Sequence, residues 1–351
     1  MKILVENSTW VNIGDGFYQY SLFHLFKTLF PHHDIQMLDG PIARAFKLTG
    51  RLTKNALNLM RFQQGDLYVF SGPILGKNFV SAYGPTIENL VNSGSQYLIL
   101  SAHAPSDLAI VDANKRFLRS YPPVAFSSRD RETYKLYADI AQTAYDGICG
   151  AFFASKVLSV PEVNLGCKYI TLSTYNEFDP YLSVPCLPLW DGNIETATIH
   201  IAERPSPYWR IARHFEWLMG KPQQFLGDFL IIRPHHDLSY YWSHLNFVRP
   251  HSFLSYNPLS YLSLYQSTSL TISNRVHACV ATLSFGKPIF FWGQTERAGV
   301  FERVGLVPHG NQIVRLPRGI LDDEYSQFCH WLTSVVNSVW NAGPRVAAPV
   351  A

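Results

Sequence analysis

The sequence predicts an α/β protein made of two doubly wound domains with a cleft between them. Short apolar segments recur along the chain, and each runs into a loop of small residues that leads to an amphipathic helix. This alternation is typical of parallel strands joined by crossover helices. It stops in a proline-rich stretch near residue 161 and resumes near residue 226, so the 351 residues divide into two such units. Ligands of such domains bind at the carboxyl ends of the strands.

The first Rossmann-like domain is predicted over residues 1–160. Residues 2–5 form a short apolar run typical of a buried strand, and a polar loop over residues 6–15 leads to a helix that ends before Pro31. The apolar residues of this helix recur at helical spacing; they are Leu22, Leu25, Phe26, Leu29 and Phe30. Further strands are predicted at residues 66–70, 97–100 and 124–127, and a helix at residues 132–138.

Residues 161–225 are interpreted as an irregular linker between the domains, because they hold seven prolines and few clear strands. Within this linker, the apolar residues of 204–219 recur at helical spacing, which favours a helix there. The second Rossmann-like domain is predicted over residues 226–340, followed by a flexible tail at residues 341–351. Its predicted strands are residues 229–232, 270–272 and 289–292, and its predicted helices are residues 258–265, 275–285, 300–304 and 322–340.

The composition excludes several classes of protein. Lys and Arg exceed Asp and Glu by only 29 to 26, which argues against a nucleic-acid partner. The five cysteines are odd in number and lack C-x-x-C spacing, so no disulfide framework or metal site is expected. No apolar run reaches the roughly 18 residues of a membrane span, and the first apolar run is too short for a signal peptide. We therefore expect a cytoplasmic protein without an integral membrane segment.

The best candidate for a functional site is the junction that contains Ser273, Asn274, Arg275 and His277. A predicted strand ends at Ile272 and a helix begins near Arg275, so both basic residues are expected in its first turn. Unpaired N–H groups and the helix dipole favour an anion there. Arg275 can clamp a carboxylate or a phosphate, and His277 can deliver a proton. The alternative is that Arg275 is a surface ion-pair partner and His277 a packing residue.

A second candidate is the loop after the first strand, with Asn12, Gly14 and Asp15. Glycines let the backbone approach a ligand, and Asp15 is suited either to accept a proton or to act as a helix N-cap. This loop is not a G-x-G-x-x-G fingerprint, and no Walker motif occurs in the chain.

Other polar residues follow predicted strands. Arg129 comes at a strand-to-helix junction and faces either solvent or the cleft, and Asp130 beside it is suited to cap the helix. Ser71, His103 and His235 follow three other strands and are candidate acceptor-site or loop residues.

Several of these junctions together resemble the polysaccharide pyruvyl transferase family. Ser273-Asn274-Arg275-Val276-His277-Ala278, continuing to Gly286-Lys287-Pro288, is similar to the family's S-x-R-x-H-A pattern and its later G-x-P turn. Asn12-Ile13-Gly14-Asp15 resembles its N-x-G-D segment, and Ser128 to Tyr134 resembles its R-D-x-x-(S/T) segment. The loops at Ser71-Gly72-Pro73 and at 101–105 occupy the places of its glycine-rich loops. The resemblance covers about residues 1–155 and 226–310.

The chain departs from the family pattern at two places. Cys149-Gly150-Ala151-Phe152 stands where the family often has a D-P-A-F-like segment. The first glycine-rich loop has one glycine where two or three are common. These departures point to a divergent acceptor site or a changed donor.

The resemblance implies a fold similar to glycosyltransferase-B and the transfer of a pyruvyl group from phosphoenolpyruvate to two hydroxyls of one sugar, forming a ketal. Arg275 and Arg129 would then bind the donor's phosphate and carboxylate, with Ser273 and Asn274 beside them. His277 would be the acid and Asp15 the base. No cofactor is implied beyond phosphoenolpyruvate as co-substrate. The acceptor would be a saccharide or a lipid-linked oligosaccharide, and the latter would bring the protein to the inner membrane face as a peripheral protein.

Two other functions fit the same features. A nucleotide-sugar-dependent glycosyltransferase of similar fold would hold a diphosphate at the Arg275 helix. A non-catalytic carbohydrate-binding protein would keep the scaffold and lose the chemistry, which agrees with the reduced glycine loop but not with the presence of both Arg275 and His277. The alternatives are distinguished by which donor, phosphoenolpyruvate or a nucleotide sugar, releases its leaving group in the presence of the protein.

Overall fold

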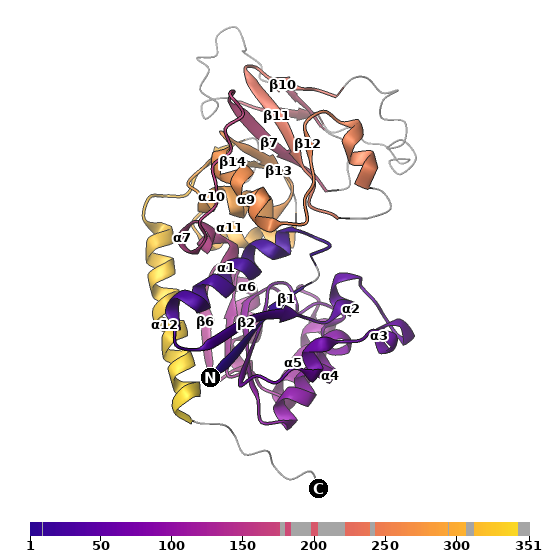
Figure 1. Cartoon of the computed structure of the whole chain (residues 1–351), viewed down its shortest axis with the longest axis vertical. Coiled ribbons are helices and arrows are strands. Elements are labelled where there is room, and N and C mark those ends of the chain that lie inside the picture. Colours follow the sequence, from indigo (N-terminus) through magenta and orange to yellow (C-terminus); the bar gives the residue numbers. More distant parts are fainter. Residues whose placement is uncertain are drawn as a thin grey trace.

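Two largely parallel β-sheets, one in each half of the chain, form the framework of the protein (Figure 1). The structure is a computed structural model, and it describes residues 1–8, 10–175, 180–183, 198–202, 222–238, 243–293, 295–306 and 312–342. The predicted helix at residues 204–219 and the tail beyond residue 342 lie outside this described part. None of the described helices is both long and apolar enough to cross a membrane.

The first sheet is entirely parallel and has the strand order β2-β1-β3-β4-β5-β6. Its strands are β1 (Lys2–Asn7), β2 (Asp34–Asp39), β3 (Leu67–Ser71), β4 (Gln96–Ala102), β5 (Ala125–Ser128) and β6 (Thr143–Asp146). The predicted strands β1, β3, β4 and β5 are confirmed. The two edge strands, β2 and β6, were not predicted, because an edge strand has little buried surface and shows no apolar run. The strand order reverses next to β1, which opens a crevice at its carboxyl end.

Helices cover both faces of the first sheet. Alternate residues of β1 point to opposite faces, so Ile3 and Val5 pack with α1 while Leu4 packs with α4 and α5. The helices of this half are α1 (Gly14–Leu29), α2 (Ile42–Ala45), α3 (Arg51–Asn55), α4 (Phe79–Asn92), α5 (Leu108–Ser120), α6 (Arg131–Tyr137) and α7 (Ala154–Val157). Short 3₁₀ turns are η1 (Leu59–Phe62), η2 (Ala138–Ile140) and η3 (Gly150–Phe153).

The second sheet has the order β10-β11-β7-β13-β14-β15, and β12 pairs with β11. Its strands are β7 (Tyr169–Ser173), β10 (Phe225–Leu226), β11 (Phe229–Pro234), β12 (Ser252–Phe253), β13 (Thr271–Ser273), β14 (Ile289–Phe291) and β15 (Ile313–Val314). Around it lie α9 (Pro258–Ser267), α10 (Val276–Ser284) and α11 (Gly299–Arg303), and the 3₁₀ turns η7 (Ser243–Val248) and η8 (Glu296–Ala298). A separate hairpin joins β8 (Tyr181–Ser183) to β9 (His200–Ala202).

The segment interpreted as an irregular linker therefore contributes a central strand. All five residues of β7 are buried, and the strand pairs in parallel with both β11 and β13. A single apolar run between prolines gave no local sign of this, because its neighbours in the sheet come from residues that follow it by about 60 to 100 positions.

The last helix, α12 (Ile320–Ala342), returns to the first domain, where Figure 1 shows it lying along that half. Trp331 stacks on Tyr145 with ring centroids 5.2 Å apart, and Trp340 contacts His33. The predicted boundary placed this helix with the second domain, as chain order suggests. Its apolar face instead packs on first-domain residues, with Phe328 against the rings of Tyr145 and Phe153, as part of the cluster that spans both domains.

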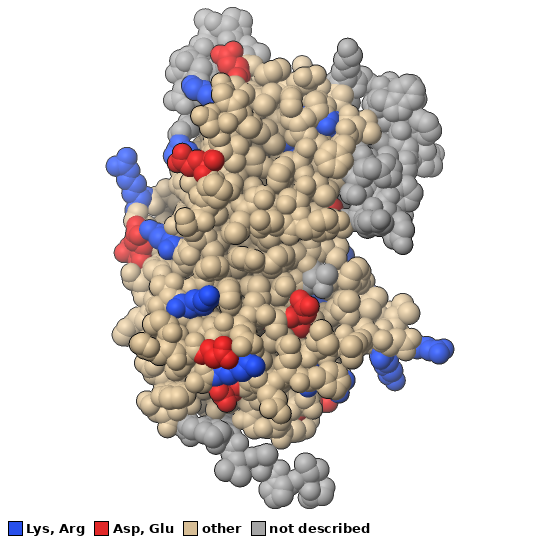
Figure 2. All heavy atoms as spheres, in the orientation of Figure 1, with Lys and Arg blue, Asp and Glu red and all other residues tan. Residues whose placement is uncertain are grey.

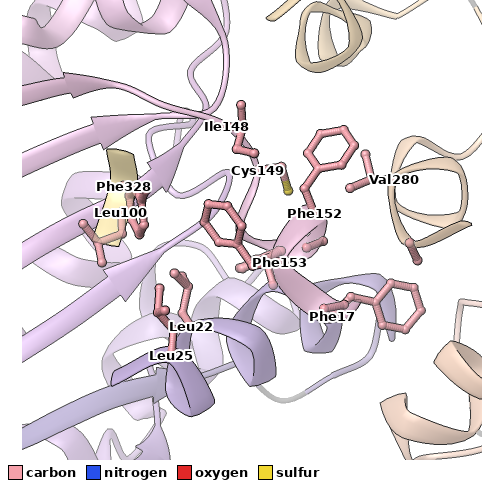
Figure 3. Packing of buried hydrophobic residues seen from close by; sticks show 14 of the residues in the cluster. Phe17, Leu22, Leu25, Leu100, Ile148, Cys149, Phe152, Phe153, Val280 and Phe328 are labelled. Carbon is pink, nitrogen blue, oxygen red and sulfur yellow. The ribbon is translucent and has the colours of Figure 1, made fainter. Parts of the chain in front are cut away.

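One hydrophobic cluster extends across the junction between the domains. Phe17 of α1 contacts the rings of His236 and Tyr265 in the second half, with centroids 5.5 and 6.0 Å away. Figure 3 shows Phe152 of η3 beside Val280 of α10, and both belong to this cluster. The junction is also hydrogen-bonded, since the N–H of Ile13 donates to the carbonyl of His236 at 2.9 Å. The cleft walls are thus held together by a shared core.

Gly16 is a point of close approach between the two domains. A Cβ added at Gly16 would overlap the ring of Pro258 at the start of α9. We expect Gly16→Ala to lower the free energy of unfolding by about 1–3 kcal/mol, the usual cost of overpacking. Urea denaturation measures this effect. Gly76→Ala is the control, because nothing lies within 4 Å of a Cβ at that position; equal stabilities of the two variants would contradict the close approach.

Candidate active site

A cavity of about 1070 Å³ lies between the domains, at the carboxyl ends of the strands of both sheets. The first domain contributes the β1–α1 loop, the α2 region and the β5–α6 turn. The second domain contributes the loop after β11, the β13–α10 turn and the loop after β14. The charged residues and histidines that line it are Asp15, Arg44, Lys47, Arg129, His236, Asp237, Arg275, His277 and Arg297.

Arg129 is a cation without a matching carboxylate in the described part of the chain. It follows β5 and is only 1% exposed. Its Nη1 contacts Nε2 of His277 at 3.2 Å, while Nε and Nη2 have no nitrogen or oxygen partner among the described residues. The buried Cys149 thiol also lies against the guanidinium, whose charge opposes the rise that burial causes in the pKa of the thiol. Leaving guanidinium donors buried and unpaired is costly. The side chain therefore has two unpaired donors at the wall of the cavity.

Asp130, the neighbour of Arg129, forms no ion pair with it within 4 Å, although the two charges attract each other. Asp130 caps α6 by accepting the N–H of Thr133 at 2.8 Å, as the sequence predicts, and it accepts a second hydrogen bond from His103 at 2.9 Å. Burial acts against ionisation of Asp130, but the His103 and Thr133 hydrogen bonds outweigh it and lower its pKa. Burial and the Arg129 guanidinium lower the pKa of His103. Asp130 is thus an ionised cap engaged by His103.

His277 is uncharged in this arrangement. Arginine only donates, so Nε2 of His277 accepts from Arg129 and the ring proton resides on Nδ1. Burial first, and then the positive charges of Arg129, Arg297 and Arg44, hold the pKa of His277 well below its usual value. Backbone packing also fixes the ring, since a Cβ at Gly14 would lie 2.9 Å from Nδ1. From the sequence, the charge of Arg275 and the dipole of the helix would also be expected to lower this pKa. The direction agrees, but the main causes are burial and arginines other than Arg275.

The sequence did not indicate three of the cations that line the cavity: Arg44, Lys47 and Arg297. Arg297 follows the predicted strand at β14, so its strand-end position was a usable signal. Arg44 and Lys47 come from the α2 region, far from any predicted strand end. With Arg129 and Arg275, they make the cavity strongly positive, opposed by Asp15 and Asp237.

A buried network holds Arg44 in place. Its Nη2 donates to the Tyr18 hydroxyl at 2.6 Å and lies 3.5 Å from Oδ2 of Asp15. Its Nη1 reaches Oε1 of Glu6, a fully buried carboxyl that also accepts from the Tyr83 hydroxyl at 2.5 Å. Burial raises the pKa of Glu6, against the lowering effect of Arg44. Arg44 thereby connects the domain core to Asp15 in the cavity.

Arg275 lines the cavity but is already engaged. It stands at the N-cap position of α10, one residue before its first turn, and is only 4% exposed. Its Nε donates to the carbonyl of Thr174 at 2.7 Å, its Nη2 pairs with Asp237 at 2.5 Å, and its guanidinium lies over the Tyr175 ring at 4.1 Å. The side chain therefore ties together the ends of β7 and β11. It is an ion-pair partner, as in the alternative interpretation of the sequence, but a buried one and not one at the surface.

Arg275→Ala is accordingly expected to destabilise the protein. The change leaves the Thr174 carbonyl and the Asp237 carboxylate without this partner, which lowers the free energy of unfolding by about 1–3 kcal/mol. Urea denaturation of the variant measures the loss. Arg318→Ala, at an exposed position before α12, is the control and is expected to change stability little. An unfolding curve for Arg275→Ala that matches the wild type would contradict this structural role.

The remaining candidates divide into two groups. Asn12, Asp15 and Asn274 line the cavity with Arg129, Arg275 and His277. Asp15 lies inside α1, whose N-cap position is Ile13, and the side chain of Asn12 accepts the N–H of Gly14 at 3.2 Å. Asp15 is therefore not the helix cap.

The other candidates serve local structure. The Ser273 hydroxyl donates to the carbonyl of Ser173 at 2.7 Å and accepts the N–H of Arg275. Ser71, His103 and His235 are absent from the cavity lining: Ser71 is buried at the end of β3, and Nε2 of His235 contacts Ser252 at 3.1 Å. His236, not His235, reaches the cavity. The described residues contain no group of three His, Cys, Asp or Glu side chains suited to hold a metal ion.

Comparison with solved structures identifies the fold. The chain is similar to a proposed UDP-N-acetylglucosamine 2-epimerase from Listeria monocytogenes, with a TM-score of 0.51, 10% identity, and coverage of 99% of this chain and 92% of that one. It is also similar to S. aureus MnaA, solved with UDP, with a TM-score of 0.53, 9% identity, and coverage of 93% and 87%. These likenesses confirm a glycosyltransferase-B-like fold with two Rossmann-like domains.

Two further comparisons concern the family. No curated protein gives a significant match to the sequence. A family model described as polysaccharide pyruvyl transferase matches residues 12–291. This range includes Asn12 and Asp15, the Arg129 junction and the Arg275–His277 turn, which all line the cavity. The chain therefore belongs to the polysaccharide pyruvyl transferase family.

Proposed function

We propose that the protein transfers a pyruvyl group from phosphoenolpyruvate to a sugar of a cell-surface or exopolysaccharide glycan and forms a pyruvate ketal. The observation that carries this proposal is Arg129, a buried guanidinium with two unpartnered nitrogens beside His277 in the cavity between the domains. Family membership supports the reaction class.

The charge of the cavity fits the donor. Phosphoenolpyruvate has a phosphate and a carboxylate on one small carbon frame, and planar guanidinium groups bind both by paired hydrogen bonds. Arg129 is our choice for the primary anion ligand, because Arg275 is already bound to Asp237 and Thr174. Lys47 and Arg297 are the other cations that line the cavity and have no carboxylate partner among the described residues.

The reaction requires one proton donor and acceptors for two hydroxyl protons. Protonation of the enol methylene leaves an oxocarbenium-like carbon that one sugar hydroxyl attacks, and departure of phosphate allows the second hydroxyl to close the ketal. Two hydroxyl protons are released. One makes up for the proton transferred to the methylene, and the other leaves with the phosphate. We assign His277 as the acid and Asp15 as the base, and the cationic side chains stabilise the departing phosphate. No further cofactor enters this scheme.

A glycosyltransferase that uses a nucleotide sugar is the competing function, and the donor decides between the two. The purified protein is incubated with either phosphoenolpyruvate or a panel of nucleotide sugars, and with α- and β-linked galactosides, glucosides and mannosides. We expect an acceptor that gains the mass of a pyruvate ketal and an equal amount of released phosphate. Glycosyl transfer, or stabilisation against heat by nucleotide sugars but not by phosphoenolpyruvate, would overturn the proposal.

A further inference from the structure

The region from α2 to η1, residues 42–62, has an outer surface of unusual composition. Six of the fourteen large apolar side chains exposed in the described part of the chain lie in these 21 residues. None of the six is a member of a described hydrophobic cluster. The six are Ile42, Phe46, Leu52, Leu57, Leu59 and Phe62, and the last is 71% exposed. Exposed apolar clusters of this kind mark sites of interaction.

The region is basic as well as apolar. Lys47, Arg51, Lys54 and Arg61 are exposed and have no ion pair among the described residues, while Arg44 points inward. No Asp or Glu occurs between Asp39 and Asp66. Figure 2 shows basic side chains that project from the side of the molecule where Figure 1 places α3. The surface therefore combines uncompensated positive charge with apolar side chains.

The backbone of this region is held to the domain from within. Ala43 and Met60 are buried in the cluster under α4, and Leu48 packs against it. The side chain of Asn58 donates to the Thr86 hydroxyl of α4. The apolar side chains are thus displayed outward on an anchored segment.

We propose that residues 42–62 dock the protein on the surface of an anionic lipid bilayer. Lys and Arg attract acidic headgroups, and Leu and Phe side chains between them enter the boundary between headgroups and acyl chains. A basic surface alone would suit a soluble polyanion, but six outward apolar side chains would gain nothing from it.

The position of this surface relates it to the active site. Arg44 and Lys47 of the same region line the cavity. Docking would therefore bring the cavity to the bilayer surface, where the glycan of a lipid-linked acceptor is held. The docking surface stands on its own observations and does not depend on the identity of the donor.

Vesicle flotation of the full chain tests the proposal. The vesicles are phosphatidylcholine with or without phosphatidylglycerol, at low and at high salt. The wild type is expected to float with anionic vesicles only and to be partly released by salt. Each surface cation removed is expected to weaken binding about fivefold, and each Leu truncated about tenfold.

Two pairs of substitutions separate the charge from the apolar contact. Arg51→Gln with Lys54→Gln removes charge, and Leu52→Ser with Leu57→Ser removes apolar surface. The matched controls are Arg318→Gln and Leu165→Ser, both at exposed positions outside this region. Neither pair includes a cavity residue, so activity on a free oligosaccharide is expected to persist.

Reduced flotation of both pairs, with normal flotation of the controls, supports the docking surface. Three results would overturn it: no flotation of the wild type, equal flotation with neutral vesicles, or an unchanged response of the paired variants. Loss of flotation in a variant that still produces the ketal would separate docking from catalysis. Flotation without any pyruvyl transfer would overturn the proposed function and leave the docking surface standing.

Discussion

Arg129→Met is expected to lower kcat/KM for phosphoenolpyruvate by about 10²–10³, the scale for removing one preorganised donor of charge stabilisation. The guanidinium is buried, two of its nitrogens have no described partner, and its third touches His277. Methionine keeps the volume and flexibility of the stem but removes every hydrogen-bond donor. Steady-state assays of phosphate release measure the effect. Arg129→Lys is expected to recover only part, because an ammonium cannot replace the planar fork.

The same substitution is expected to leave the fold intact or to stabilise it. Folding takes the Arg129 charge out of water without a carboxylate to pair with it, so an apolar side chain removes that cost. Urea denaturation should then show an unfolding free energy equal to or above that of the wild type, together with loss of the thermal shift caused by phosphoenolpyruvate. Arg119→Met, which removes a guanidinium on the exposed face of α5, is the activity control. A variant that is active and less stable would show that Arg129 is structural.

His277→Gln is expected to lower kcat by about 10²–10⁴, as for loss of a general acid, while donor affinity falls much less. Glutamine fills the same space but has no proton to transfer at this pH. Burial and the neighbouring arginines hold the pKa of His277 well below 6.5, so the ring is neutral near pH 7. A bound dianion reverses the local field and draws the Arg129 donors to itself. The pKa of His277 then rises, and Nε2 becomes free to take a proton.

The pKa of His277 is thus expected to be lower without the donor than with it. At pH values between these two pKa values, donor binding should be accompanied by uptake of one proton. Affinity for phosphoenolpyruvate weakens as pH rises through the higher value, because the bound state then loses its proton. Calorimetry in buffers of different ionisation enthalpy counts the proton. His103→Gln is the control, since the pKa of His103 is also lowered and Asp130 binds it. If proton uptake persisted in His277→Gln but vanished in His103→Gln, the proton would be taken up by His103. That result would contradict the role of His277 as the acid.

Local pattern was sufficient for the central strands other than β7, and for the loops where polar candidate residues would gather. The apolar runs at β1, β3, β4, β5, β11, β13 and β14 each bury enough side chain to be visible in the sequence. Because parallel strands present their carboxyl ends at one edge, the loops after them could be expected to meet. Asp15, Arg129, Arg275 and His277 do line one cavity, although Arg129 and His277 are 148 residues apart.

Which of these residues is available to a ligand depended on partners that no local pattern indicates. Arg275 and Arg129 look alike as cations at strand-to-helix junctions. The folded chain places Asp237 and the Thr174 carbonyl against the first, and no described carboxylate against the second. In the same way, β7 became a central strand through β11 and β13, and Arg44 entered the cavity through Glu6 and Tyr18. Charge pairing and strand pairing act over a few ångströms in space. The partners of a residue or strand can therefore come from distant parts of the chain, and only the tertiary structure shows which they are.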